Sequence, residues 1–200
     1  MKRGVKKHSS PTGVLRIISG KWRGRKLAVI DVEGLRPTTD RTKETLYNWL
    51  MPYLTDSSCL DMFAGSGSLG LEALSRYAAH VTFIEQNKAA CEVIRTNLKT
   101  LSVSADAAVV LHGDALTLSA KLQNNFNIIF IDPPFNQGLV AKSISQLVAA
   151  ELVNSGSLIY IECERENANY AVPANWQCIK DKQTQQVSSR VFQVTALNQD

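Results

Sequence analysis

Short apolar runs alternate with segments whose apolar positions recur every three or four residues, through most of the chain. Continuous apolar runs predict buried strands, and the 3.6-residue period predicts amphipathic helices. The expected strands are 58–63, 81–85, 108–111, 127–131 and 157–162, and the expected helices are 68–78, 88–101, 115–122 and 139–152. Apolar strands that alternate with helices indicate an α/β fold with a doubly wound, mostly parallel sheet.

The N-terminal quarter departs from this alternation. Residues 14–19 and 26–30 predict two short strands around a glycine-containing turn region, which together form a small β-hairpin extension. A helix follows, which Thr39 or Asp40 can cap and which Pro52 is expected to end. Its apolar positions at helical spacing are Leu46, Trp49, Leu50 and Tyr53.

The C-terminal end also breaks the rhythm. Residues 176–180 and 187–196 read as strands with only a short linker between them. A linker this short cannot hold a crossover helix, so the two strands are expected to pair antiparallel. We expect this hairpin at an edge of the sheet.

Length and composition are those of a single globular domain with a short appendage. The chain has 200 residues, of which 44% are hydrophobic and 20% charged. No apolar run approaches the ~20 residues that span a bilayer, and the basic start lacks the apolar stretch of a secretory signal. We therefore expect a cytoplasmic protein whose four cysteines are buried, reduced thiols, with no metal site.

Positive charge is concentrated in the first 53 residues. Residues 1–53 hold 12 Lys and Arg against 4 Asp and Glu, whereas residues 54–200 hold 10 against 14. We expect 1–53 to be a basic extension that contacts a polyanion, joined to a globular domain over 54–200. The cations expected to touch nucleic acid are interleaved with Trp22; they are Lys21, Arg23, Arg25 and Lys26.

A glycine-rich loop joins the first strand of the alternation to the helix that follows. Gly65, Gly67 and Gly70 have the spacing of a dinucleotide-binding turn, so an NAD-binding domain is one interpretation. Asp61 argues against it, because a carboxylate there repels a pyrophosphate but can accept from the amino group of a cationic amino acid. Asp61, Phe63, Gly65 and Gly67 are therefore candidate cofactor-binding residues.

Further carboxylates follow the next two strands. Glu85 ends one strand 20 residues after the first glycine of the loop, where it can accept from both hydroxyls of a ribose. Asp114 follows the third strand, where it can accept from an adenine amino group, cap the next helix, or do both. Asp114 and the adjacent Ala115 complete the candidate cofactor site, since ligands bind at the carboxyl ends of such strands.

The fourth strand ends in a turn that indicates the chemistry. Asp132, Pro133, Pro134 and Phe135 form an Asp-Pro-Pro-Phe sequence. Two prolines stiffen the backbone and remove two N–H donors, which leaves the Asp132 carboxylate and the Pro133 carbonyl as acceptors. This pair suits an sp² amino group, whose lone pair is freed to attack an electrophilic methyl group, and Phe135 supplies a face for stacking a base.

Together, these motifs resemble the class I S-adenosylmethionine-dependent methyltransferases that act on amino groups. Within that class three segments resemble the RsmD family: Arg-Ile-Ile-Ser-Gly-Lys-Trp-Arg-Gly-Arg-Lys-Leu at 16–27, Arg-Pro-Thr-Thr-Asp-Arg at 36–41 and Glu-Thr-Leu-Tyr-Asn-Trp at 44–49. The resemblance extends from residue 14 to about residue 195. It departs at Asn136 and Gln137, where relatives are expected to carry basic side chains.

The resemblance implies a seven-stranded sheet, S-adenosylmethionine as cofactor, and methylation of guanine N2 in 16S ribosomal RNA. The substrate would be presented by the small ribosomal subunit or its assembly intermediate. Separately, we expect the protein to be a monomer. Residues 36–41 would lie near the cofactor and the flipped base, so Arg36, Thr39 and Arg41 are expected to contact RNA.

The residues alone leave other functions open. An adenine-N6 DNA methyltransferase uses a similar turn, although 200 residues leave little room for its target-recognition region. A protein glutamine methyltransferase favours Asn-Pro-Pro-Tyr over the present Asp-Pro-Pro-Phe. An NAD oxidoreductase leaves that turn unused, and an RNA-binding module explains neither loop. Only the resemblance selects guanine over adenine.

Overall fold

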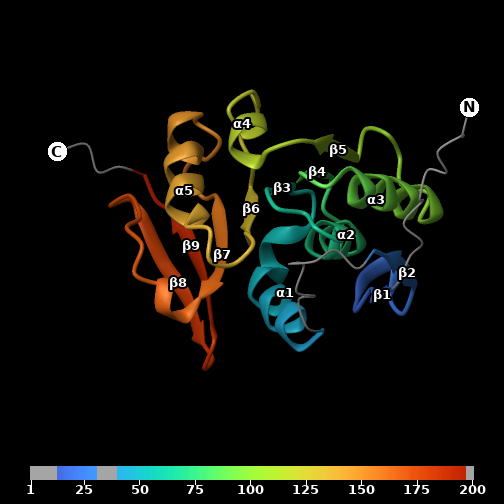
Figure 1. The fold of residues 1–200 in the computed structure, drawn as a ribbon, viewed down its shortest axis with the longest axis horizontal. Helices are drawn as coiled ribbons and strands as arrows, with labels where there is room; N and C mark the ends of the chain where they lie inside the picture. The colour runs from blue at the N-terminus through green and yellow to red at the C-terminus, as the bar shows by residue number, and fades with distance from the viewer. Residues whose placement is uncertain (1–12, 31–39, 197–200) are drawn as a thin grey trace, which may run out of the picture.

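A twisted seven-stranded sheet forms the centre of the computed structural model, which describes residues 13–30 and 40–196 (Figure 1). Its strand order is β5-β4-β3-β6-β7-β9-β8. The first five strands of this order are mutually parallel. Strand β9 runs antiparallel to its neighbours β7 and β8. The strands are β3 Ser58–Asp61, β4 His80–Glu85, β5 Ala108–His112, β6 Ile128–Ile131, β7 Leu158–Glu164, β8 Trp176–Gln183 and β9 Val187–Val194.

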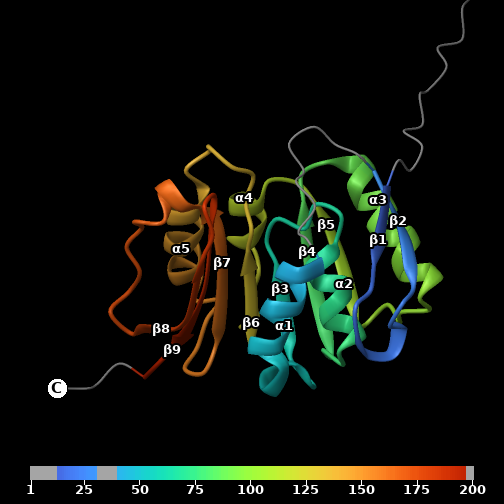
Figure 2. The same cartoon turned by 90° about the horizontal axis from the view of Figure 1, so that it is seen from below.

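Helices cover both faces of the sheet (Figure 2). One face carries α1 Asp40–Leu54, α2 Ser68–Ser75 and α3 Lys88–Thr100, and the other carries α4 Ala115–Ser119 and α5 Leu139–Ala149. Alternate residues of the central strand β6 serve the two layers, since successive side chains of a strand point to opposite faces. Phe130 packs in the first layer and Ile129 in the second. The expected doubly wound fold is confirmed.

A small antiparallel hairpin precedes the sheet. It consists of β1 Gly13–Arg16, the 3-10 turn η1 Gly20–Trp22 and β2 Lys26–Val29, as the sequence predicted. Its apolar side chains enter the core layer of α1, α2 and α3, so the hairpin packs directly on the sheet's own helices. Whether 1–53 functions as a separate extension stays a prediction.

One buried carboxylate joins the hairpin to α2. Glu72 is fully buried, and its two oxygens accept the backbone N–H groups of Ile18 at 2.8 Å and Ser19 at 3.0 Å. Arg76 Nε donates to the same carboxylate at 2.8 Å. Gly20, at φ +81°, lies so close that an added Cβ would stand 1.8 Å from the Ser75 carbonyl oxygen. Hairpin and helix are therefore in direct backbone contact.

Three local predictions were wrong. Pro52 does not end α1, which continues to Leu54, because Leu54 is buried in the core and holds the last turn in place. Tyr53, expected on the apolar face of this helix, is 43% exposed. Cys178 is exposed on the edge strand β8, while Cys59, Cys91 and Cys163 are buried, and all four thiols are free. Within 13–30 and 40–196, no helix has the length and apolarity to cross a membrane.

We predict that Glu72→Ala lowers the free energy of unfolding by about 3–5 kcal/mol, because it leaves Arg76 and two backbone donors buried without their acceptor. Urea unfolding monitored by circular dichroism measures this change. The control is Glu92→Ala, which removes an exposed ion pair with Arg95 and should cost less than about 1 kcal/mol. Equal losses in the two variants would contradict the anchoring role of Glu72.

Candidate active site

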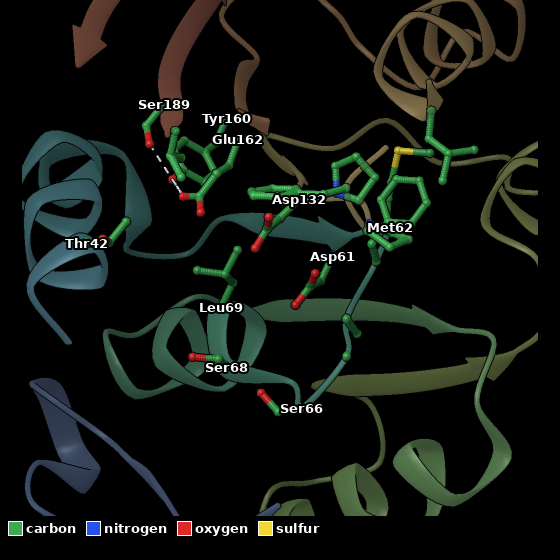
Figure 3. Close-up of a pocket in the computed structure, with 18 of the residues that line it drawn as sticks. Thr42, Asp61, Met62, Ser66, Ser68, Leu69, Asp132, Tyr160, Glu162 and Ser189 are labelled. Atoms are coloured by element: carbon green, nitrogen blue, oxygen red, sulfur yellow. Dashed lines mark hydrogen bonds between the residues drawn. The ribbon is translucent and has the colours of Figure 1, made fainter. Parts of the chain in front are cut away.

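A cavity of about 1380 Å³ opens at the carboxyl ends of the parallel strands (Figure 3). It lies where the order of the sheet reverses, between β3 and β6, since β3 leads on to β4 on one side and β6 to β7 on the other. Ligands of doubly wound sheets bind at such a switch point. The carboxylates that line it include Asp61, Glu85, Asp114, Asp132 and Glu162.

The glycine loop forms one wall of the cavity. Gly65 and Gly67 have φ of +54° and +77°, the left-handed region that glycine adopts without strain. Gly67 is the N-cap of α2, so the loop delivers the chain directly into the helix. Asp61 is buried beneath the loop, and its Oδ2 accepts the backbone N–H of Gly70 at 3.0 Å. Phe63 lines the same wall.

Burial raises the pKa of Asp61 to about 7. The Gly70 N–H opposes this shift, and the nearby negative charge of Glu85 adds to it. A carboxyl group with this pKa is poised between its neutral and charged forms near neutral pH. A cation bound against Asp61 favours the charged form, which matches the amino group that the sequence predicted as its ligand.

Glu85 and Asp114 also support the local backbone. Glu85 accepts the N–H of Gly65 at 2.7 Å and that of Asn87 at 2.6 Å, so it ties the end of β4 to the glycine loop. Asp114 caps α4 by accepting the N–H of Thr117 at 2.8 Å, as expected. A carboxylate has about four acceptor positions, so these contacts leave capacity for a ligand at both residues.

The donors and acceptors of this half of the cavity fit S-adenosylmethionine. Three carboxylates end three successive strands, and Ala115, also predicted, lines the cavity beside Asp114. Ser68 Oγ, at the start of α2, is buried without a hydrogen-bond partner and lines the same space. A bound ligand with polar groups would satisfy this hydroxyl. Within the described ranges, no group of three or more His, Cys, Asp and Glu side chains is arranged to hold a metal ion.

The Asp-Pro-Pro-Phe turn forms the opposite wall. Asp132 and Phe135 are half-buried, Pro133 is buried and Pro134 is exposed; all four line the cavity. The turn closes at Asn136, whose φ of +62° is in the left-handed region that asparagine tolerates better than most residues. The Asn136 N–H donates to Glu164 of β7. A conformational requirement therefore accounts for asparagine at this position.

Several cavity residues were missed by sequence reasoning because they lie on the C-terminal hairpin or inside β7. Tyr160, Glu162 and Ser189 form a hydrogen-bonded cluster in the wall (Figure 3). Lys182 of β8 donates to Thr45 Oγ1 of α1 at 3.1 Å, so the C-terminal hairpin contacts the N-terminal helix at the cavity. Their sequence context contains no motif, and only the strand pairing brings them to the site.

The structure does not bring the basic cluster to the cavity. Trp22 N donates to Ser75 Oγ and Arg25 donates to the Thr100 carbonyl, so Lys21, Arg23, Arg25 and Lys26 lie near the carboxyl-terminal ends of α2 and α3. The cavity lies at the opposite end of α2, about 12 Å away by the rise of an eight-residue helix. Among the three predicted RNA contacts at 36–41, Arg41 lines the cavity, and Arg36 and Thr39 lie outside the described residues.

We predict that Asp61→Asn removes a pH dependence from stability. The folded pKa of about 7 exceeds the ordinary aspartate pKa of 3.8, so between these values the folded state retains a proton that the unfolded state releases. Stability of the unsubstituted protein should therefore fall, relative to the variant, by about 2–3 kcal/mol between pH 5 and pH 8. Urea unfolding at both pH values tests this, and parallel stability curves would contradict it.

Comparison with known proteins identifies the family. A family model described as conserved hypothetical protein 95 matches residues 15–193. Ribosomal RNA small subunit methyltransferase D of Escherichia coli (strain K12) is 48% identical over 188 residues, which cover 94% of each chain. The Haemophilus influenzae protein of the same name is 47% identical over 193 residues, covering 94% of this chain and all of that one, 100%.

The fold agrees with the sequence comparison. The solved structure of a putative methyltransferase from Escherichia coli matches with a TM-score of 0.85 at 46% identity, over 92% of this chain and 100% of that one. The seven-stranded sheet with its N-terminal hairpin, predicted from the resemblance, is therefore confirmed. By motif, fold and relatives, this chain belongs to the RsmD family of ribosomal RNA small subunit methyltransferases.

Proposed function

We propose that this chain methylates the exocyclic N2 amine of a guanine in 16S ribosomal RNA. As expected, it is a methyltransferase by family, with S-adenosylmethionine as cofactor. The observation that carries the proposal is that the glycine loop and the Asp-Pro-Pro-Phe turn line one cavity. A cofactor on the first wall and an amine on the second meet at the switch point between β3 and β6.

The first wall holds the cofactor through its carboxylates. Asp61 receives the amino group, Glu85 the ribose hydroxyls and Asp114 the adenine amino group, while Phe63, Gly65, Gly67 and Ala115 shape the surface. S-adenosylmethionine, when bound, supplies an electrophilic methyl group on its sulfonium. Glu85 also holds the Gly65 N–H, so ribose binding and loop conformation depend on one side chain.

The second wall holds the amine. The Asp132 carboxylate and the Pro133 carbonyl accept its two N–H groups, which turns the nitrogen lone pair toward the methyl donor. Phe135 stacks on the base, worth about 1–3 kcal/mol. The nucleophile loses its proton after attack, so the wall needs no strong base, and most of the rate comes from positioning. Arg41 lies at the same cavity for contact with the nucleotide.

The names of the relatives indicate small-subunit ribosomal RNA as the substrate. We propose that the guanine is presented by the small subunit or its assembly intermediate in the cytoplasm, and that the protein acts as a monomer. A guanine in a hairpin loop is the least costly target, because a stacked base must first be extruded. The family names argue against the DNA, protein-glutamine and NAD alternatives.

The N-terminal basic residues hold a different part of the RNA. Lys21, Arg23, Arg25 and Lys26 lie at the far end of α2 from the cavity, so they cannot contact the target base. Lys21 Nζ stands 4.3 Å from the centre of the Trp22 ring, which leaves an aromatic face beside a cation. The positive charge of this cluster and its distance from the cavity suit phosphate contacts that position the RNA without reading its sequence.

We predict that Asp132→Ala lowers methylation of small-subunit RNA about 100-fold or more, the usual loss when a preorganised polar group at the reacting centre is removed. Transfer of labelled methyl groups to small subunits that lack the modification measures the rate. Asp106→Ala, an exposed aspartate beyond the cavity, is the control and should keep full activity.

Label found as N2-methylguanine in 16S RNA would support the proposed substrate and the chemistry together. Label in DNA adenine or protein would overturn the substrate. Full activity of the Asp132→Ala variant would overturn the role assigned to the turn.

For the basic cluster, we predict a weaker salt dependence of RNA binding in a Lys21→Gln/Arg23→Gln variant. Each cation that neutralises a phosphate contributes about 0.7–0.9 to the slope of log affinity against log salt concentration, so removing two cations should lower the slope by roughly 1.4–1.8. Titration of small-subunit RNA at several salt concentrations measures it. A Lys121→Gln/Lys142→Gln variant, altered at exposed lysines on the α4–α5 side, should keep the slope.

A further inference from the structure

A second carboxylate stands beside Asp132 in the wall that holds the amine. In the parallel pair β6–β7, Ile131 is in register with Ile161, so Asp132 and Glu162 follow at the next position of adjacent strands. Neighbouring strands lie about 4.8 Å apart, and residues in register point to the same face. Both side chains line the cavity (Figure 3), and Glu162 is 8% exposed.

Two hydroxyl groups hold this carboxylate in place. Tyr160, two residues earlier on the same face of β7, donates its hydroxyl to Glu162 Oε2. Ser189, paired with Glu162 across β7–β9, lies 3.4 Å from the same oxygen through its Oγ. Burial and the charge of Glu162 raise the pKa of Tyr160 well above its ordinary value, so the phenol keeps its proton and remains a donor.

Glu162 lies apart from the carboxylates assigned to the cofactor. The cofactor carboxylates follow β3, β4 and β5, on one side of the switch point, whereas Glu162 lies on β7, on the other side with the Asp-Pro-Pro-Phe turn. Glu162 therefore stands on the side of the cavity assigned to the amine, where a base that enters would meet it.

Guanine brings donors at adjacent positions. Its Watson–Crick edge carries an N1–H next to the N2 amino group, whereas adenine has an acceptor lone pair at N1. With Asp132 and the Pro133 carbonyl on the amino group, an acceptor one strand spacing away faces N1. We propose that Glu162 accepts the N1–H of the target base and thereby selects guanine over adenine, an inference that rests on the proposed function.

This assignment gives Glu162 the role of a specificity-determining residue. Adenine in the same pose would place its N1 lone pair against the carboxylate, and the repulsion would remove it from the cavity. Tyr160 and Ser189 act on specificity through Glu162, by holding its carboxylate in one orientation. Base recognition by Glu162 thus gives a role to all three hydrogen-bonded cavity residues, Tyr160, Glu162 and Ser189.

The test compares guanine with 2-aminopurine, which keeps the amino group at C2 but carries no hydrogen on N1. Small subunits are reconstituted from ribosomal RNA with either base at the methylated position, and initial rates are measured for the full-length protein. The unsubstituted protein should prefer guanine by about 10–100-fold, the usual effect of one hydrogen bond to a charged acceptor. Equal rates on the two substrates would overturn the proposal without any variant.

The Glu162→Gln variant distinguishes recognition of the N1–H from the effects of other differences between the two bases. The variant should lose most of its guanine activity and methylate the two substrates at rates within about threefold of each other. Asp132→Ala should lower both rates and keep their ratio. Glu166→Gln, an exposed glutamate that does not line the cavity, should keep both rates.

The melting temperature and S-adenosylhomocysteine affinity of Glu162→Gln show whether the fold and the cofactor half are intact. With both intact, an unchanged preference for guanine would overturn the role of Glu162. Absence of methylation of guanine by the unsubstituted protein would instead overturn the proposed function. The two failures are therefore distinguishable.

Discussion

The reversal of strand order between β3 and β6 is the constraint on which the active site depends. Two parallel strands pair side by side there, while their following segments leave toward opposite edges of the sheet, so the space beyond their carboxyl ends stays open. The glycine loop follows β3 and the Asp-Pro-Pro-Phe turn follows β6. The pairing of Asp61 with Phe130 thus sets the separation between the glycine loop and this turn.

Buried carboxylates recur in this molecule, and each is stabilised by nearby donors. Glu72 is held by backbone N–H groups and Arg76, Asp61 by the Gly70 N–H, and Glu162 by hydroxyl groups. The contacts of Glu72 join the hairpin to α2 and include the cation Arg76. Asp61 and Glu162 both line the cavity, whereas Glu72 lies between the hairpin and α2.

Local chemistry explains why most elements could be read from the sequence. The strands from β3 to β7 are short, largely apolar runs, and each forms within two residues of its predicted bounds. The errors have tertiary causes. Core packing of Leu54 extends α1 past Pro52, and the edge position of β8 exposes Cys178. Neither effect is visible in a local pattern, because both depend on what lies against the segment.

The sequence by itself determined the fold class, the family and the two loops that line the cavity, because each of these is encoded by neighbouring residues. Only the tertiary structure placed Glu162 beside Asp132, brought Lys182 to Thr45 and separated the basic cluster from the cavity. These residues lie far apart along the chain, and strand register and helix direction decide how they are placed relative to one another. Side chains distant along the chain become neighbours only when parallel strands pair in a particular order and register.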